Sequence, residues 1–304
     1  MGCLSFAACT SGGKKVSADE KPSSPEPAAV VFPLPDVPAM MTDPQERGEF
    51  LLVHYWDKFD FADTALVNNR DISEQGFADQ LALLAKAPEN TAKESLEKLC
   101  TGFEVHGHAR KVFMQMVDDY LYNPNSPYYN GTLYGIYLRR MLASSVLDEA
   151  YRTSLQFRLD LISRNRRGTK AEDFTYYLPD GSRNTLYHTP MKGKHLLVVF
   201  YDPECQSCHE TLRQMIADKQ LAEAVSDGRL TVLAVYTEGN FEMWKQTVPE
   251  MPRAWIICTD REQVKERALY DLKAMPSLYL LDSVKRVLFK DASFEEVKEK
   301  IGTF

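Results

Sequence analysis

The stretch that decides the fold is HLLVVFYDPECQSCH, which spans residues 195–209. Residues 196–201 form a continuous apolar run, which is typical of a buried strand. A polar turn follows and carries Cys205 and Cys208 in C-x-x-C spacing, and residues 210–216 then show helical periodicity. Cys205 is therefore expected at a helix N-terminus, where unpaired N–H groups and the helix dipole stabilise a thiolate. We interpret the stretch as a redox-active dithiol.

The composition describes a globular chain that is long enough for two domains. Of its 304 residues, 44% are hydrophobic and 26% are charged. The 36 basic and 43 acidic residues give a net charge of −7, so no nucleic-acid partner is expected. The sequence contains no apolar run long enough to cross a bilayer.

The cysteines favour catalysis over a structural role. Among six cysteines, only Cys205 and Cys208 share a recognised short spacing, and no second C-x-x-C completes a zinc site. We therefore expect no metal, and no cofactor beyond the redox-active disulfide of this pair. Cys100 and Cys258 lie among apolar residues and are expected in the core.

The N-terminal segment, residues 1–40, has the composition of a tail or a tether. Residues 6–9 read FAAC and resemble the end of a bacterial lipoprotein signal, in which Cys9 would be lipidated. The apolar segment before it is short and has no preceding basic residue. Residues 11–40 are rich in Ser, Pro, Ala and Lys and predict a linker. A lipid tether and a plain disordered terminus both fit this composition.

Residues 41–167 are predicted to form an all-helical domain. Asp43-Pro44 is a good helix start, and Ser73 is expected to cap a second helix. Two further helices are expected over residues 133–141 and 147–162. Apolar residues recur at helical spacing in four preceding sets, which are Leu52, Trp56 and Phe59; Phe77, Leu81 and Leu84; Ala92, Leu96, Leu99 and Phe103; and Ala109, Phe113, Met116 and Tyr120.

Residues 168–304 are predicted to form an α/β domain. Asp180-Gly181 indicates a hairpin, and Ser293 with Glu296 forms a capping box before a last helix. The order of elements indicates a central, partly parallel sheet with helices on both faces. The expected strands cover residues 174–178, 184–188, 196–201, 230–236, 254–258, 277–282 and 286–290, and the expected helices run from Cys208 to Val225 and over residues 241–248 and 261–272.

Disulfide exchange requires a nucleophilic thiolate and a second thiol that breaks the mixed disulfide. The first thiol of the motif faces solvent on the turn, so we expect Cys205 to attack and Cys208 to resolve. The negative charges of Asp202 and Glu204 oppose the thiolate. We therefore expect a Cys205 pKa that is not strongly depressed and a reducing couple.

Residues 200–210, together with AMPSLYLLD over residues 274–282, resemble the TlpA/ResA type of thioredoxin-like thiol-disulfide oxidoreductase. The resemblance covers residues 168–304 and implies a thioredoxin-like fold. It also implies a cis-proline at Pro276 opposite the dithiol. The backbone of Met275 would then turn outward to pair with an extended substrate segment.

The sequence departs from this family at the positions around the dithiol. Glu204 replaces the usual tryptophan, and with Met275 it is a candidate substrate-binding residue. Val199 stands where thioredoxin has a buried aspartate, so the proton-transfer partner is open. His209 and Glu210 are the candidates for that role.

The helical part resembles a domain of unknown function that precedes thioredoxin-like domains in bacterial lipoproteins. Residues 55–61 and 71–77 carry this resemblance, which implies no activity.

These features together predict a lipid-anchored thiol-disulfide oxidoreductase in the periplasm or cell envelope. Its partners would be envelope proteins that contain disulfides and a thiol-reducing donor. Two alternatives remain. The protein would be a ligand- or partner-binding lipoprotein if its thioredoxin-like domain served as a scaffold or redox sensor. Cys208-His209 also completes C-x-x-C-H, the haem-attachment pattern, although a strand–helix junction in an α/β sheet is an unusual place for haem.

Overall fold

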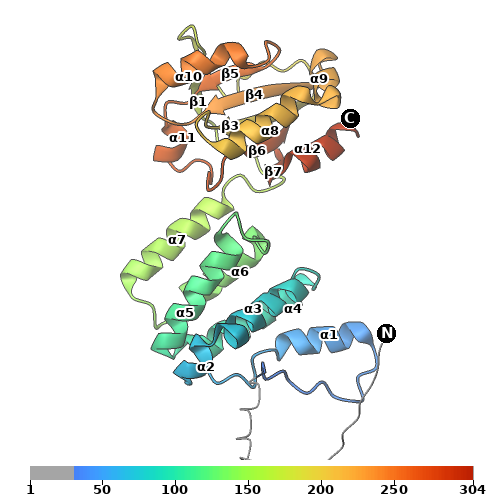
Figure 1. Ribbon diagram of the computed structural model, residues 1–304, viewed down its shortest axis with the longest axis vertical. Coiled ribbons are helices and arrows are strands. Elements are labelled where there is room, and N and C mark those ends of the chain that lie inside the picture. Colours follow the sequence, from blue (N-terminus) through green and yellow to red (C-terminus); the bar gives the residue numbers. More distant parts are fainter. Residues whose placement is uncertain (1–30, 304) are drawn as a thin grey trace, which may run out of the picture. The chain divides into compact units, whose positions relative to one another are not determined.

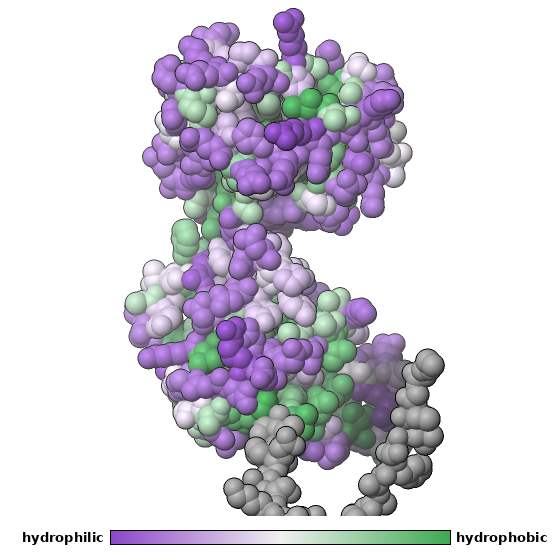
Figure 2. Space-filling view, viewed as in Figure 1, coloured by the Kyte–Doolittle hydropathy of each residue, from purple (hydrophilic) through white to green (hydrophobic). Residues whose placement is uncertain are grey.

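A computed structural model describes residues 31–303 of the chain (Figure 1). The predictions for residues 1–30, including lipidation of Cys9, lie outside the described residues. The described chain has a helical region followed by an α/β region. The face shown in Figure 2 is largely hydrophilic, in keeping with the net charge of −7.

Helices and connecting turns make up the described chain from Pro44 to Ser163, without a strand. Short polar side chains begin several of these helices. Asp43 accepts hydrogen bonds from the backbone of the first turn of the first helix, and Asn130 does the same for the helix that follows it. The helices are α1 (Pro44–Val53), α2 (Thr64–Asn68), α3 (Arg70–Leu84), α4 (Glu89–Glu104), α5 (Gly107–Val117), the π-helical turn η1 (Asp118–Tyr122), α6 (Gly131–Leu142) and α7 (Glu149–Ser163).

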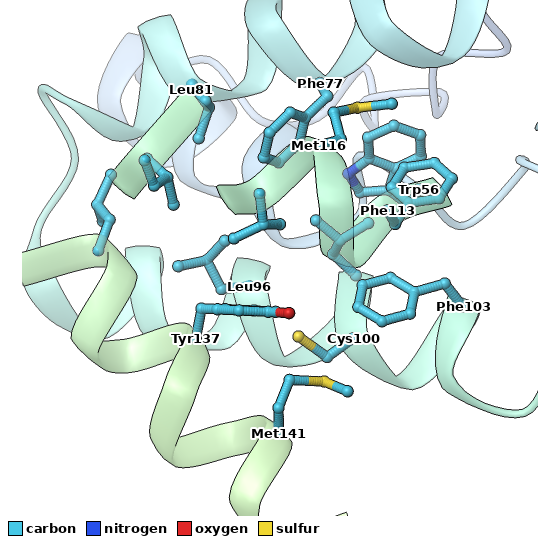
Figure 3. Packing of buried hydrophobic residues seen from close by; sticks show 14 of the residues in the cluster. Trp56, Phe77, Leu81, Leu96, Cys100, Phe103, Phe113, Met116, Tyr137 and Met141 are labelled. Atoms are coloured by element: carbon cyan, nitrogen blue, oxygen red, sulfur yellow. The ribbon is translucent and has the colours of Figure 1, made fainter. Parts of the chain in front are cut away.

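The core of the helical region combines aromatic and aliphatic side chains and encloses a buried chain of polar groups. The Trp56 Nε1 donates to Gln80 Oε1 at 2.8 Å, and Gln80 Nε2 donates to Ser95 Oγ at 2.9 Å. Ser95 Oγ in turn donates to the Leu52 carbonyl at 2.6 Å, so each group has a partner. Cys100 is fully buried near Tyr137 and belongs to this core, as the sequence predicts (Figure 3).

Some helix boundaries differ from the sequence-based expectation, and Tyr120 lies in the π-helical turn η1 and not in α5. The helix α1 ends at Val53. Trp56 and Phe59 therefore lie in the turns that follow the helix, and their side chains are buried in the core from there. Ser73 is not a helix cap, because α3 begins at Arg70 after an extended Asn69, and the Ser73 hydroxyl donates to carbonyls behind it. Phe32, which the composition places in the linker, packs against the rings of Trp56 and Phe59.

Seven strands of the described chain form one mixed sheet in the order β2-β1-β5-β4-β3-β6-β7. The central strands β3 and β4 pair in parallel, as do β4 and β5, and the remaining pairs are antiparallel. A partly parallel central sheet is therefore confirmed. The strands are β1 (Thr175–Tyr177), β2 (Arg183–Thr185), β3 (His195–Tyr201), β4 (Leu230–Tyr236), β5 (Ile256–Thr259), β6 (Ser277–Asp282) and β7 (Val287–Ala292).

Side chains of β3 alternate between two cores because successive strand residues point to opposite faces. Leu197 and Val199 join one core with helical residues such as Leu212 and Val297, while Val198 joins the other. Burial on both faces explains why β3 is an uninterrupted apolar run. The helices of this region are α8 (Gln206–Ala217), α9 (Lys219–Ser226), α10 (Phe241–Thr247), the 3₁₀ turn η2 (Val248–Glu250), α11 (Gln263–Glu266) and α12 (Phe294–Ile301).

Two predicted helices of this region are shorter than expected. The helix predicted from Cys208 to Val225 breaks at Asp218, whose backbone is extended and whose side chain caps α9. The helix predicted over residues 261–272 is reduced to α11, because Glu262 and Ala268 have positive φ angles of 65° and 48°. The capping box of Ser293 with Glu296 is confirmed at the start of α12.

Candidate active site

The two motif cysteines lie where β3 meets α8. Cys205 is the N-cap residue of α8, and its N–H donates to the Asp202 carbonyl at 3.1 Å. The Glu204 N–H donates to the Asp202 carboxylate at 2.9 Å, which closes the turn. Cys205 is partly exposed, whereas Cys208, on the inner side of the first helical turn, is fully buried. One thiol is therefore open to solvent and the other is enclosed.

The loop before β6 lies against this turn because β6 is the antiparallel neighbour of β3. Ser277, the first residue of β6, pairs with Phe200 near the end of β3. The preceding peptide bond, Met275–Pro276, is cis. The Met275 carbonyl oxygen lies 3.8 Å from Cys205 Sγ, so the proline loop and the partly exposed thiol form one site.

Ser207, between the two cysteines, joins the thiol to the proline loop. Its Oγ lies 3.0 Å from Cys205 Sγ and donates to the Met275 carbonyl at 2.7 Å. Sequence reasoning missed this residue. The available signal was its place two residues after the N-cap, which puts its side chain on the first helical turn beside the cysteine.

Comparison with known proteins accounts for both parts of the chain. The family model DUF5106, a domain of unknown function, matches residues 8–165. The crystal structure of a thioredoxin-like protein from Bacteroides caccae is 36% identical, with 90% of this chain and 98% of that chain covered and a TM-score of 0.82. This chain is a thioredoxin-like protein of the DUF5106 family.

Further similar structures cover the C-terminal part of this thioredoxin-like protein. The C-terminal domain of an uncharacterized protein from Bacteroides fragilis is 35% identical, covering 45% of this chain and 98% of that one at a TM-score of 0.44. A domain of a possible thiol-disulfide isomerase from Cytophaga hutchinsonii is 21% identical over 46% of this chain and 94% of its own, with a TM-score of 0.40. No curated protein matches the chain.

The two thiols of the thioredoxin-like domain differ in the direction of their pKa shifts. The hydrogen bond from Ser207 is the largest cause that lowers the pKa of Cys205, followed by the backbone N–H of Cys208. Burial raises the pKa of Cys208 to about 12. The N–H of Asp202, which lies 3.4 Å from the Cys208 sulfur, has a smaller and opposite effect on this pKa. Cys205 is therefore the thiol that ionises first.

The other predicted site residues lie on the surface around the dithiol. Glu204, His209 and Glu210 are all exposed. Glu210 accepts a hydrogen bond from Gln206 Nε2 at 3.2 Å. Within residues 31–303, no hydrogen bond links the side chain of His209 or of Glu210 to either motif thiol. The structure thus brings Cys205, Cys208, Met275 and Pro276 together, and leaves the two proton-transfer candidates facing solvent.

The described residues contain no group of three His, Cys, Asp or Glu side chains that could hold a metal ion. Cys258 is fully buried in β5, as predicted, where its thiol lies 3.4 Å from the Ala234 carbonyl. From residue 31 to residue 303, none of the helices has the length and apolar character that a bilayer span requires.

Proposed function

We propose that this protein is a thiol-disulfide oxidoreductase in which Cys205 is the nucleophile and Cys208 the resolving thiol. The observation that carries the proposal is the contrast between the two sulfurs. Cys205 is partly exposed and has a lowered pKa, while Cys208 is fully buried and has a raised one. Disulfide exchange needs this difference between the two thiols. Only a thiolate attacks, and the second thiol must stay protonated until the mixed disulfide has formed.

Each turnover transfers two electrons from the dithiol to a substrate disulfide. The Cys205 thiolate attacks one substrate sulfur, a mixed disulfide forms, and the other substrate sulfur leaves as a thiolate that takes up a proton. Cys208 then attacks Cys205 Sγ, and the proton that it loses passes through solvent to the departing substrate thiolate. The Cys205–Cys208 disulfide forms and the second substrate thiolate leaves. The protein ends oxidised, and a thiol-reducing donor must restore the dithiol.

The proline loop provides a docking position for the substrate backbone. The Met275 carbonyl lies 3.8 Å from Cys205 Sγ, at the end of β6 that adjoins the dithiol. An extended substrate segment can place an N–H on this oxygen while its disulfide faces the thiol. Glu204 is exposed on the adjoining turn and offers a contact to basic or polar substrate side chains.

The proposed setting is the cell envelope, and the proposed substrates are disulfide-containing envelope proteins. The support is the sequence FAAC at residues 6–9, which places Cys9 where a lipoprotein signal would be cleaved and lipidated. A resemblance to the TlpA/ResA type agrees with a reducing role. Mass analysis of the protein isolated from membranes tests the lipid, because an acylated N-terminal Cys9 has a characteristic added mass.

Reduction of insulin disulfides, with dithiothreitol as donor, tests the proposed activity. We expect Cys205→Ser to abolish turnover, and pre-reduced Cys208→Ser to accumulate mixed disulfides with insulin when dithiothreitol is left out. Cys258→Ser makes the same chemical change in a buried strand and should retain turnover, so it is the matched control. Full activity of Cys205→Ser would contradict the assignment of the nucleophile. Absence of turnover in the unaltered protein would favour the alternative of a ligand- or partner-binding lipoprotein.

A further inference from the structure

The hydroxyl of Ser207 lies between two groups with different tasks in the proposed function, on which the following inference rests. One is the Cys205 sulfur, 3.0 Å away, and the other is the Met275 carbonyl, 2.7 Å away. Ser207 is exposed, so its side chain can rotate without repacking a core. The first group carries out the exchange, and the second is where a substrate N–H would dock.

A serine hydroxyl has a single proton to donate and two acceptors within reach here. While Cys205 is a neutral thiol, the carbonyl of Met275 is the better acceptor for the hydroxyl. The thiol can then donate to Ser207 Oγ at 3.0 Å or, over 3.8 Å, to the Met275 carbonyl itself. Once Cys205 is a thiolate, its charge makes it the stronger acceptor, since hydrogen bonds to ionised groups are about twice as strong as neutral ones. Deprotonation therefore draws the hydroxyl proton away from the carbonyl.

We propose that Ser207 couples the docking carbonyl of Met275 to the charge of Cys205. The hydroxyl caps the carbonyl when the sulfur is neutral and leaves it open when the sulfur is a thiolate. The reactive form of the protein is thereby the form whose docking position is free. When the Cys205–Cys208 disulfide forms, the sulfur is neutral again, and the hydroxyl returns to the carbonyl in competition with the N–H of the product.

Other titratable groups also lie around this pair: His209 and Glu210 are exposed on α8, and next to Pro276 the Ser277 hydroxyl donates to Asp291 Oδ1 at 2.6 Å. Asp202 and Glu204 lie on the turn before the thiol, and Cys208 lies inside the same helix. On the opposite loop, Lys273 is paired with Asp271 at 2.7 Å. Ser207 alone contacts both the sulfur and the carbonyl through its side chain in the described part of the chain.

The ¹³C chemical shift of the Met275 carbonyl, followed through the titration of Cys205, tests the coupling without any substrate. A carbonyl shift responds to the hydrogen bonds that the oxygen accepts. In the full-length reduced protein, we expect the Met275 carbonyl to titrate with the same midpoint as the Cys205 Cβ signal. In Ser207→Ala, the amplitude of the carbonyl change should fall by at least half. The Cys205 midpoint should rise by roughly one pH unit.

Two further variants separate the coupling from other effects. Ser207→Thr keeps a hydroxyl and should restore the amplitude. Ser226→Ala removes a hydroxyl that donates to the Glu223 carbonyl at 3.0 Å in α9, and should leave the titration unchanged. Equal amplitudes in all variants would overturn the proposal, because the carbonyl would then respond only to the nearby charge. If the Met275 carbonyl shift did not follow the ionisation of Cys205 while the protein still reduced insulin, the coupling alone would be overturned. If the unaltered protein did not reduce insulin, the proposed function would be overturned instead.

Discussion

The contrast between the two thiols makes a quantitative prediction for alkylation of the reduced protein. At pH 7 a thiol whose pKa is about 12 is ionised to only about 1 part in 10⁵. An ordinary thiol, with a pKa of about 8.5, is about 3% thiolate at pH 7, and the hydrogen bond from Ser207 shifts the pKa of Cys205 down from its ordinary value. A thiol of ordinary pKa and Cys208 therefore differ in thiolate fraction at pH 7 by a factor of about 3,000.

Intrinsic nucleophilicity reduces this factor, because a thiolate of higher pKa is more reactive once formed. With a Brønsted coefficient of about 0.45, a difference of about 3.5 pKa units offsets roughly 40-fold. We therefore expect Cys205 to react with iodoacetamide on the order of 80-fold faster than Cys208 at pH 7. The burial of Cys208 slows its reaction further, since the reagent must reach a sulfur with no exposed surface.

Timed alkylation followed by peptide mapping measures the two rates in one sample. The same labelling in denaturant is the control, because both thiols should then react at similar rates. If Cys208 of the native protein reacted as fast as Cys205, the reasoning from burial and hydrogen bonding would be refuted. Raising the pH toward 10 should increase the rate at Cys208 about tenfold per unit, while the rate at Cys205 levels off.

Two more predictions concern buried polar groups away from the dithiol. Burial raises the pKa of Asp260 to about 6, so its contribution to stability is present below pH 4 and is lost as the pH rises through 6. The free energy of unfolding of Asp260→Asn minus that of the wild type, measured in urea titrations, should therefore rise by about 3 kcal/mol from pH 4 to pH 7. A difference that does not change with pH would contradict this. Ser95→Ala should lower the free energy of unfolding by about 2–3 kcal/mol, because the Gln80 amide loses its acceptor and the Leu52 carbonyl loses one of its donors. Ser154→Ala, at an exposed position of α7, is the control. An equal loss of free energy of unfolding in the two variants would argue against a stabilising role for the buried hydrogen bonds of Ser95.

The sequence predicted the sheet better than it predicted the helices. The strands β3 and β4 lie within long apolar runs. Such a run is typical of a central strand whose two faces are both buried, so the sequence indicates these strands directly. Helix ends depend on single backbone conformations instead. Asp218 is extended and Ala268 has a positive φ angle of 48°, and the apolar pattern gives no sign of either. The predicted helices around these residues were consequently too long.

The candidate site was predictable where it depends on spacing and not where it depends on long-range contact. The burial of Cys208 and the partial exposure of Cys205 follow from their places on one helical turn. The hydrogen bond from Ser207 to Met275 joins residues 68 positions apart, and no local pattern indicates it. Sequence reasoning gave weight to the charges of Asp202 and Glu204, whereas the Ser207 hydroxyl is the largest influence on the pKa of Cys205.

Trapping of the mixed disulfide tests the central claim most directly. Reduced Cys208→Ser protein is mixed with oxidised glutathione, and the cysteine that carries glutathione is identified by peptide mass mapping. We predict a stable adduct on Cys205, while the unaltered protein under the same conditions loses the adduct and gains the Cys205–Cys208 disulfide. A double variant, with serine at both positions, corrects for any glutathione on other cysteines. An adduct that forms elsewhere but not on Cys205, or that persists on Cys205 when Cys208 is present, would contradict the account.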